Sequence, residues 1–327
     1  MPGRAENSMK HWLKLLGLST IGLCLCLWLG RGSQAIDLNL VLGVARQTTV
    51  VVAQDLKDGD NQALREAFRP GSGVLIGRKN DDYYVLTNAH VVSARGTDYG
   101  VRTADGIVHF VDDQDTNDNI IPLGKLNQNK VEGSDLAVVH FTAPGKNYPI
   151  VTINRQKITK EPVFVAGWPD PGPQFPSRSF RLTSGTLRAL LKQPEDGDYN
   201  TQYSAPTRRG MSGGPVFNSR GELIAIHGRG GGKNLAEYGE PDRDCAQDCV
   251  NRGIAIDIFL AKTQQNPRYA PIFASAPPDP KTVAQLPLAP SSQIIADIYK
   301  LFTDLRGVKT KVDDIEKRLE RLPQDRL

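Results

Sequence analysis

Short apolar runs rich in β-branched residues recur between residues 45 and 260, and they constrain the fold more than any other feature. Each run has the length of one strand, and turn-forming residues such as Asn80-Asp81 separate the runs. Examples are TTVVVAQ (48–54), SGVLIG (72–77), DLAVVHF (135–141), PVFVAGW (162–168) and ELIAIHG (222–228). Many short strands with hairpin turns between them are typical of sandwiches and barrels. The sequence therefore predicts an all-β fold.

The first 35 residues have the layout of a secretory signal peptide. Lys10 and Lys14 precede an uncharged, largely apolar run over residues 15–29, and small residues follow at the end of the segment. This order predicts cleavage before Ile36. The apolar run is shorter than the roughly 20 residues of a membrane span, which favours a cleaved peptide over the alternative, an uncleaved anchor. We expect an exported protein, periplasmic or secreted, with no membrane segment after cleavage.

The charge balance argues against nucleic acid as a partner. The chain of 327 residues has a formal net charge of +4, but residues 1–35 carry four basic residues and one acidic residue. The rest has 36 basic and 35 acidic residues, a net charge of +1, and so lacks the excess of positive charge that is typical of a nucleic-acid-binding protein. Hydrophobic residues make up 39% and charged residues 23% of the chain, which is typical of a folded protein.

Cys245 and Cys249 are the two cysteines outside the predicted signal peptide. In an exported protein, a close cysteine pair favours a disulfide that closes a small surface loop. A zinc site would need two further ligands, and no histidine lies nearby in the sequence. The sequence thus predicts a structural disulfide here, no metal site and no cofactor.

The C-terminal part differs from the rest of the chain in composition and in the spacing of its apolar residues. Residues 266–293 contain seven of the 22 prolines, which predicts an extended, semi-rigid linker. In the segment 294–322, apolar residues then alternate spacings of four and three: Ile294, Ile298, Leu301, Leu305, Val308, Val312, Ile315, Leu319 and Leu322. This heptad pattern predicts a coiled coil and therefore a homo-oligomer. The alternative, an amphipathic helix packed on its own domain, would drift toward a 3.6-residue period.

The stretch RRGMSGGPVF places one hydroxyl, that of Ser212, among three glycines. A serine becomes a strong nucleophile when a base accepts its proton and a carboxylate orients that base. Glycines let the backbone turn tightly and approach a substrate closely. The N–H groups of Gly210 and Ser212 are candidates for an oxyanion hole. Taken alone, the stretch also fits a plain glycine-rich turn.

Two further motifs supply a candidate base and a candidate carboxylate. LTNAHVV places His90 after a strongly apolar run, and GSDLAVVHF places Asp135 before one. The order His90, Asp135, Ser212, together with TNAHVV, SDLAVV, GMSGGPVF and ELIAIHG, resembles the chymotrypsin-like (trypsin-like) serine proteases. The resemblance covers about residues 45–260 of a protease domain that we place at 36–265.

This resemblance implies a fold, a reaction and a role for each residue. It implies two antiparallel β-barrels, at about 45–145 and 150–260, with the active site between them. His90 would act as general base and then as general acid, Asp135 would hold its tautomer, and Ser212 would be acylated. The substrates would be proteins or peptides.

The strand after the nucleophile implies a substrate pocket. In this family that strand pairs with the substrate, and here it contains His227, Gly228 and Arg229. In the related bacterial glutamyl endopeptidases, a histidine at this place and a threonine five residues before the nucleophile bind an acidic side chain. Thr207 stands at that place here. The resemblance implies a preference for acidic residues, and the alternative is that His227 has no such role.

Met211 departs from the pattern of the animal trypsins, which have an aspartate just before the nucleophile. That aspartate pairs with the new N-terminus after activation cleavage, and methionine cannot form this pair. The departure points to bacterial exported trypsin-like peptidases, which need no such pair. Two functions follow as hypotheses: an exported serine endopeptidase, or a non-catalytic oligomeric scaffold with a protease-like fold.

Overall fold

The computed structural model describes residues 36–57, 70–94, 97–111, 119–127, 130–171, 178–231 and 250–287. The predicted signal peptide, the Cys245–Cys249 pair and the predicted coiled coil lie outside the described residues. From Asp37 onward, the described elements belong to one structural unit.

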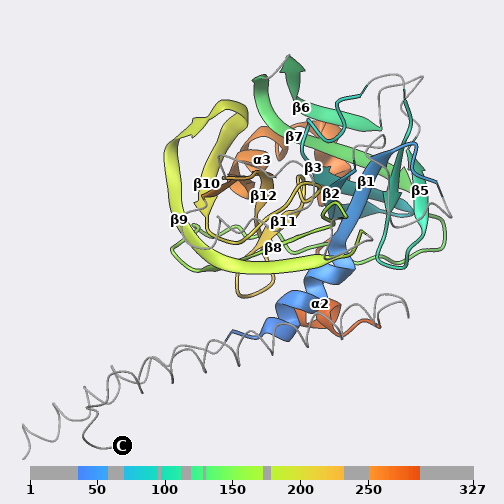
Figure 1. Ribbon diagram of the computed structural model, residues 1–327. Helices are drawn as coiled ribbons and strands as arrows, with labels where there is room; N and C mark the ends of the chain where they lie inside the picture. The colour runs from blue at the N-terminus through green and yellow to red at the C-terminus, as the bar shows by residue number, and fades with distance from the viewer. Residues whose placement is uncertain are drawn as a thin grey trace, which may run out of the picture. The chain divides into compact units, whose positions relative to one another are not determined.

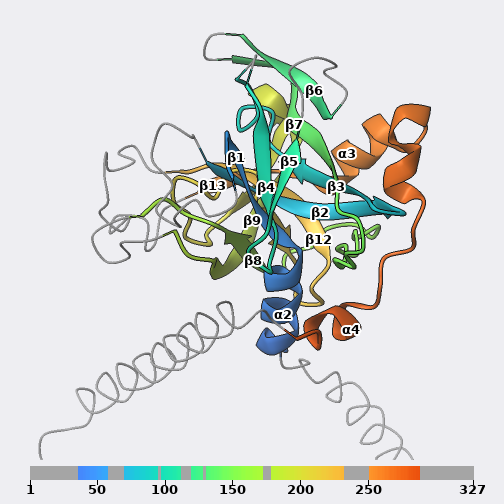
Figure 2. The same ribbon diagram turned by 90° about the vertical axis from the view of Figure 1, so that its right-hand side faces the viewer.

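The first half of this unit is a seven-stranded antiparallel sheet (Figures 1 and 2). Its strands are β1 (Thr49–Gln54), β2 (Gly71–Lys79), β3 (Asp82–Thr87), β4 (Tyr99–Arg102), β5 (Val108–Val111), β6 (Ile120–Asn127) and β7 (Lys130–Thr142). They follow the order β5-β4-β1-β2-β3-β7-β6. β5 approaches β7, but the described residues form no ladder between these two strands. The sheet is therefore curved into a half-barrel.

The second half is a closed antiparallel barrel of six strands in the order β10-β13-β12-β11-β8-β9. Its strands are β8 (Pro162–Gly167), β9 (Arg181–Glu195), β10 (Tyr199–Tyr203), β11 (Pro215–Phe217), β12 (Leu223–Arg229) and β13 (Asn251–Ala255). The long β9 curves around the barrel (Figure 1). The prediction of a mostly β, chymotrypsin-like fold is confirmed.

The apolar runs of the sequence fill three main cores. One cluster, which includes Val52 and Val85, lies within the N-terminal sheet. A second, which includes Val165 and Met211, lies within the barrel. The largest cluster joins residues of both halves. Because a shared core fixes the two halves against each other, residues that lie at their junction keep fixed positions relative to one another.

Helix α2 (Leu38–Thr48) precedes β1, so the predicted barrel boundary at residue 45 falls inside a helix. The carboxylate of Asp37 caps this helix by accepting from the N–H groups of Asn39 and Leu40, both at 3.1 Å. After β13, helix α3 (Ile256–Thr263) packs against the barrel. Within the described ranges, no helix is long and apolar enough to cross a membrane.

The proline-rich segment after α3 is folded onto the protein. It forms a 3₁₀ helix, η4 (Pro267–Phe273), and a short helix, α4 (Pro280–Ala284). η4 buries Tyr269 and Ile272 against β2, and α4 buries Val283 beside α2 (Figure 2).

The predicted extended linker at 266–293 is therefore wrong for residues 267–284. Proline fits the first turn of a helix, where its missing N–H has no partner in any case. Pro267 and Pro280 both stand there. The side chains of Asn266 and Asp279 cap the two turns.

Candidate active site

The loop that carries Ser212 is a tight turn in which two glycines are required. The N–H of Met211 donates to the carbonyl of Arg208 at 3.1 Å. Gly210 and Gly213 have φ values of +87° and +83°, which side-chain-bearing residues rarely adopt. A Cβ on Gly213 would also overlap the backbone of β2 and the hydroxyl of Thr87. The glycines around the serine therefore serve conformation and close packing.

The N-terminal sheet holds this loop through three hydrogen bonds. The N–H of Ser72 donates to the carbonyl of Ser212 at 2.8 Å, and its hydroxyl donates to the carbonyl of Gly210 at 2.8 Å. The N–H of Gly213 donates to the side-chain oxygen of Asn88 at 2.7 Å. The nucleophile loop of the barrel is thus positioned by residues at the end of β3 and the start of β2.

His90 and Asp135 form a hydrogen-bonded pair in the same sheet. His90 lies in the turn after β3, and Asp135 lies in β7. His90 Nδ1 is 2.8 Å from Asp135 Oδ2, and the backbone N–H of His90 donates to Oδ1 at 3.0 Å. Asn88 joins the two parts of the site, because its amide also donates to the carbonyl of Asp135 at 2.7 Å.

Asp135 is 2% exposed and is kept ionised by its partners. Burial raises the pKa of a carboxyl, but the hydrogen bond and the charge of His90, with the hydroxyl of Tyr199, hold the pKa of Asp135 below its usual value. Tyr199 donates to Oδ2 at 2.6 Å. A buried anion beside Nδ1 fixes His90 in the tautomer whose Nε2 is free to accept a proton.

The hydroxyl of Ser212 donates to the carbonyl of Gly228 at 3.4 Å in this structure. Among the described residues, the N–H groups of Gly210 and Ser212 form no hydrogen bond. Two unpaired N–H groups beside a hydroxyl have the chemistry required of an oxyanion hole.

The trypsin-like peptidase domain family matches residues 71–226, a range that includes His90, Asp135 and Ser212. This range is a trypsin-like peptidase domain, and it covers a little under half of the chain, 156 of 327 residues.

Curated relatives of this chain are named HtrA-like serine proteases. One from Staphylococcus epidermidis is 30% identical over 198 residues, which cover 55% of this chain and 30% of the relative. One from Staphylococcus aureus is 29% identical over 168 residues, which cover 48% of this chain and 19% of the relative. The chain thus spans less than a third of their length. A solved HtrA-type protease with a bound tripeptide is 21% identical, with a TM-score of 0.45, over 68% of this chain and 61% of that chain.

An ion pair with a buried arginine lies beside the nucleophile loop. Arg178, which is 1% exposed, donates to a carboxylate oxygen of Asp170 and to the carbonyl of Trp168. The N–H of Asp170 donates to the carbonyl of Arg209 at 2.9 Å. This last hydrogen bond joins the ion pair to the nucleophile loop.

The predicted substrate-binding residues are mostly engaged with the protein itself. His227 is 2% exposed, and its Nδ1 lies 2.7 Å from the hydroxyl of Tyr203. Burial, together with the nearby His90, lowers the pKa of His227 to about 3, so its imidazole is neutral. Thr207 is also buried. Arg229 forms an ion pair with Asp196 at 3.0 Å.

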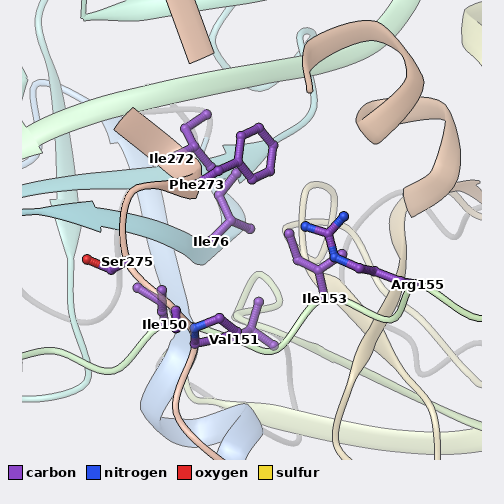
Figure 3. Close-up of a pocket in the computed structure, with 10 residues that line it drawn as sticks. Ile76, Ile150, Val151, Ile153, Arg155, Ile272, Phe273 and Ser275 are labelled. Atoms are coloured by element: carbon purple, nitrogen blue, oxygen red, sulfur yellow. The ribbon is translucent and has the colours of Figure 1, made fainter. Parts of the chain in front are cut away.

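A small pocket of about 210 Å³ lies between η4 and the connection that leads from β7 to β8 (Figure 3). Ile272 and Phe273 lie on one side of it, and Ile150 and Val151 lie on the other. Its lining is largely apolar, and none of the three motif residues lines it. This pocket is separate from the candidate active site.

Three residues that shape the site have no role that the sequence pattern predicts: Asn88, Arg178 and Tyr199. Asn88 stands inside the quoted TNAHVV motif, so its polarity beside a strand end was a detectable signal. Arg178 and Tyr199 stand outside every motif, and only the fold brings them to the site.

Proposed function

We propose that this chain is an exported serine endopeptidase that cleaves peptide bonds through an acyl-enzyme on Ser212. The observation that carries the proposal is the pair of hydrogen bonds by which Asn88 links the Ser212 loop to the strand of Asp135. The names of the curated relatives support the same reaction. A fluorophosphonate probe tests it, because such a probe labels an activated serine whatever the specificity. The proposal predicts labelling of wild type and none of Ser212→Ala.

The reaction proceeds in two halves. A rotation about χ1 releases the hydroxyl of Ser212 from Gly228, and His90 Nε2 takes its proton as the oxygen attacks the scissile carbonyl. The N–H groups of Gly210 and Ser212 stabilise the oxyanion. The imidazolium then protonates the leaving amine, and the amine departs. Water, activated by the same imidazole, hydrolyses the ester and restores the hydroxyl.

The peptidase needs no trypsin-type activation cut. Met211 is 1% exposed and packs in the barrel core, so it leaves no carboxylate for a new N-terminus. Arg178 and Asp170 support the loop from within the chain instead. Protein that starts at Ile36 should react with the probe at once. Labelling that needs a further defined cleavage would reject this proposal.

The substrate pocket formed by His227 and Thr207 prefers an acidic residue, glutamate before aspartate, on the acyl side of the scissile bond. When the hydroxyl of Tyr203 donates to Nδ1, the proton of the neutral His227 lies on Nε2, which can donate to a carboxylate. The Thr207 hydroxyl is the second donor. A hydrogen bond to a charged group is worth about 1.5–3 kcal/mol, which gives about a tenfold preference or more. A cleavage-site profile tests it: no acidic enrichment, or a profile unchanged in His227→Ala, would reject it.

Export and assembly complete the proposal. Residues 1–35 direct export, a Cys245–Cys249 disulfide forms in the oxidising compartment, and the heptads of 294–322 join copies of the chain. Light scattering on the mature protein and on a truncation after Pro290 tests assembly. The mature protein should be an oligomer and the truncation a monomer, whereas a monomeric mature protein at micromolar concentration would refute the coiled coil.

A further inference from the structure

The hydroxyl of Tyr199 donates to the same carboxylate oxygen that His90 contacts. Tyr199 stands at the start of β10 and is fully buried. Its hydroxyl lies 2.6 Å from Asp135 Oδ2, and His90 Nδ1 lies 2.8 Å from that oxygen. The barrel therefore contributes a donor to a pair that otherwise belongs to the N-terminal sheet.

We propose that Tyr199 is a positioning residue of the catalytic site, which holds the Asp135 carboxylate in the orientation that His90 requires. The inference rests on the proposed peptidase function. Tyr199 forms no hydrogen bond with Ser212 or with the N–H groups of the oxyanion hole, so it acts through Asp135. Its hydroxyl shares the negative charge of the carboxylate and limits its rotation about χ2.

The turn before Tyr199 locks its backbone to the strand of Asp135. This turn, η2 (Asp196–Asp198), has positive φ values at Gly197 (+78°) and Asp198 (+68°). Such values cost energy for a non-glycine residue, and contacts must hold them. Asp198 accepts from the hydroxyl of Ser134 at 2.5 Å and pairs with Lys262 at 3.1 Å. Ser134 immediately precedes Asp135, so one short turn fixes both ends of the tyrosine–aspartate bond.

Gly228 leaves the space that the hydroxyl fills. A Cβ at this position would overlap the hydroxyl oxygen of Tyr199 and would lie 2.8 Å from two of its ring carbons. Gly228 also accepts the hydrogen bond of Ser212. The tyrosine at 199 therefore requires a glycine at 228, because any side chain there would displace its hydroxyl.

Burial and the charge of Asp135 keep the tyrosine hydroxyl protonated, and therefore a donor, against the opposing charge of Arg229. Burial, with the adjacent charge of Asp135, raises the pKa of Tyr199 well above its ordinary value. The guanidinium of Arg229 lies over the ring at 4.2 Å from its centroid, and Arg229 is held there by Asp196. Besides His90, the other titratable groups near the bond are Asp198 in the turn, Lys262 in α3, and Tyr203 and the neutral His227 in the barrel.

The test compares Tyr199→Phe with Tyr83→Phe and wild type. Tyr83 is a suitable control, because it is fully buried and its hydroxyl is also hydrogen-bonded, but to Lys146 and Tyr148 rather than to the catalytic site. The rate of fluorophosphonate labelling is measured across pH, which requires no knowledge of the substrate. Thermal unfolding checks that each variant is folded.

We expect Tyr199→Phe to be labelled about tenfold more slowly than wild type at the pH optimum, as befits a lost hydrogen bond to a charged group. The acidic limb of its pH profile should move to higher pH. The reason is that a carboxylate with one donor fewer attracts the imidazolium more strongly, so the base keeps its proton longer. Tyr83→Phe should keep the wild-type rate and limb.

Two outcomes would overturn the role of Tyr199 while the peptidase function stands. One is wild-type labelling and an unchanged limb in Tyr199→Phe. The other is slower labelling with an unmoved limb, which a purely structural role would give. Failure of the wild type itself to be labelled would reject the proposed function, and the inference with it.

Discussion

The guanidinium of Arg178 lies directly behind Gly210, so that a Cβ on this glycine would come within 2.6 Å of Nη1. Arg178 is held there by Asp170, whose own N–H donates to the backbone of the nucleophile loop. An internal ion pair thus lies against the nucleophile loop, and it is available without proteolysis.

Replacing Asp170 by asparagine should destabilise the protein and slow labelling. The buried Arg178 would keep its charge and lose the carboxylate, a loss worth about 3 kcal/mol in the free energy of unfolding. Denaturant unfolding and probe labelling measure the two effects. Arg209→Gln is the control: Arg209 also pairs with Asp170, at 3.4 Å, but its side chain is 69% exposed. Its loss should cost about 1 kcal/mol or less. Equal costs in the two variants would show that the buried pair does not support the loop.

His227 should make the protein less stable as the pH falls. In the folded protein its pKa is lowered to about 3 from an ordinary 6.5 by burial. As the pH falls, His227 therefore binds a proton in the unfolded chain before it does so in the folded protein. The free energy of unfolding that neutral His227 contributes is complete above the unfolded-state pKa of about 6.5 and is lost as the pH falls below that pKa. Between about pH 6.5 and about pH 4.5, the free energy of unfolding should drop by about 1.4 kcal/mol per unit from this residue.

Urea unfolding at several pH values, on wild type and on His227→Gln, measures this slope. The variant should show a shallower dependence over the same window. Asp135 does not interfere there, because its pKa is held below an ordinary value of 3.8 and its contribution is lost only at lower pH. Superimposable slopes would mean that His227 is not buried in its neutral form.

The docked segment after α3 predicts a contrast between two apolar residues. Ile272 is 2% exposed and packs against β2, whereas Leu286 is 38% exposed. Ile272→Ala should cost about 2–5 kcal/mol in the free energy of unfolding. Leu286→Ala should change it by about 0.5 kcal/mol or less. Thermal or denaturant unfolding decides, and a negligible cost at Ile272 would mean that η4 is detached in solution.

The fold class could be predicted from the sequence, because strand length and β-branched composition are local signals. His90 and Asp135 could be predicted as well, because each stands in a short motif next to an apolar run. Tyr199 has no such signal, because its partner Asp135 lies 64 residues away and only chain topology joins them. Arg178 stands outside every motif, and an arginine is usually exposed, so its burial beside Gly210 could not be predicted.

Composition was misleading in the proline-rich segment. The prolines there predict an extended chain, yet two of them begin helical turns capped by Asn266 and Asp279. Burial of Ile272 and Val283 outweighs the extended preference of the prolines around them. Local composition could not reveal this burial, because the surfaces that receive these residues, β2 and α2, lie at the other end of the sequence.

Hydrolysis of casein by wild type and by Ser212→Ala tests the central claim most directly. Loss of the nucleophile should reduce turnover by about 10⁴-fold or more while the thermal unfolding transition is kept. Activity in wild type that vanishes in the variant is the result predicted here. Equal activity in the two proteins, or none in a folded wild type that binds casein, would contradict it and favour a protease-like binding scaffold.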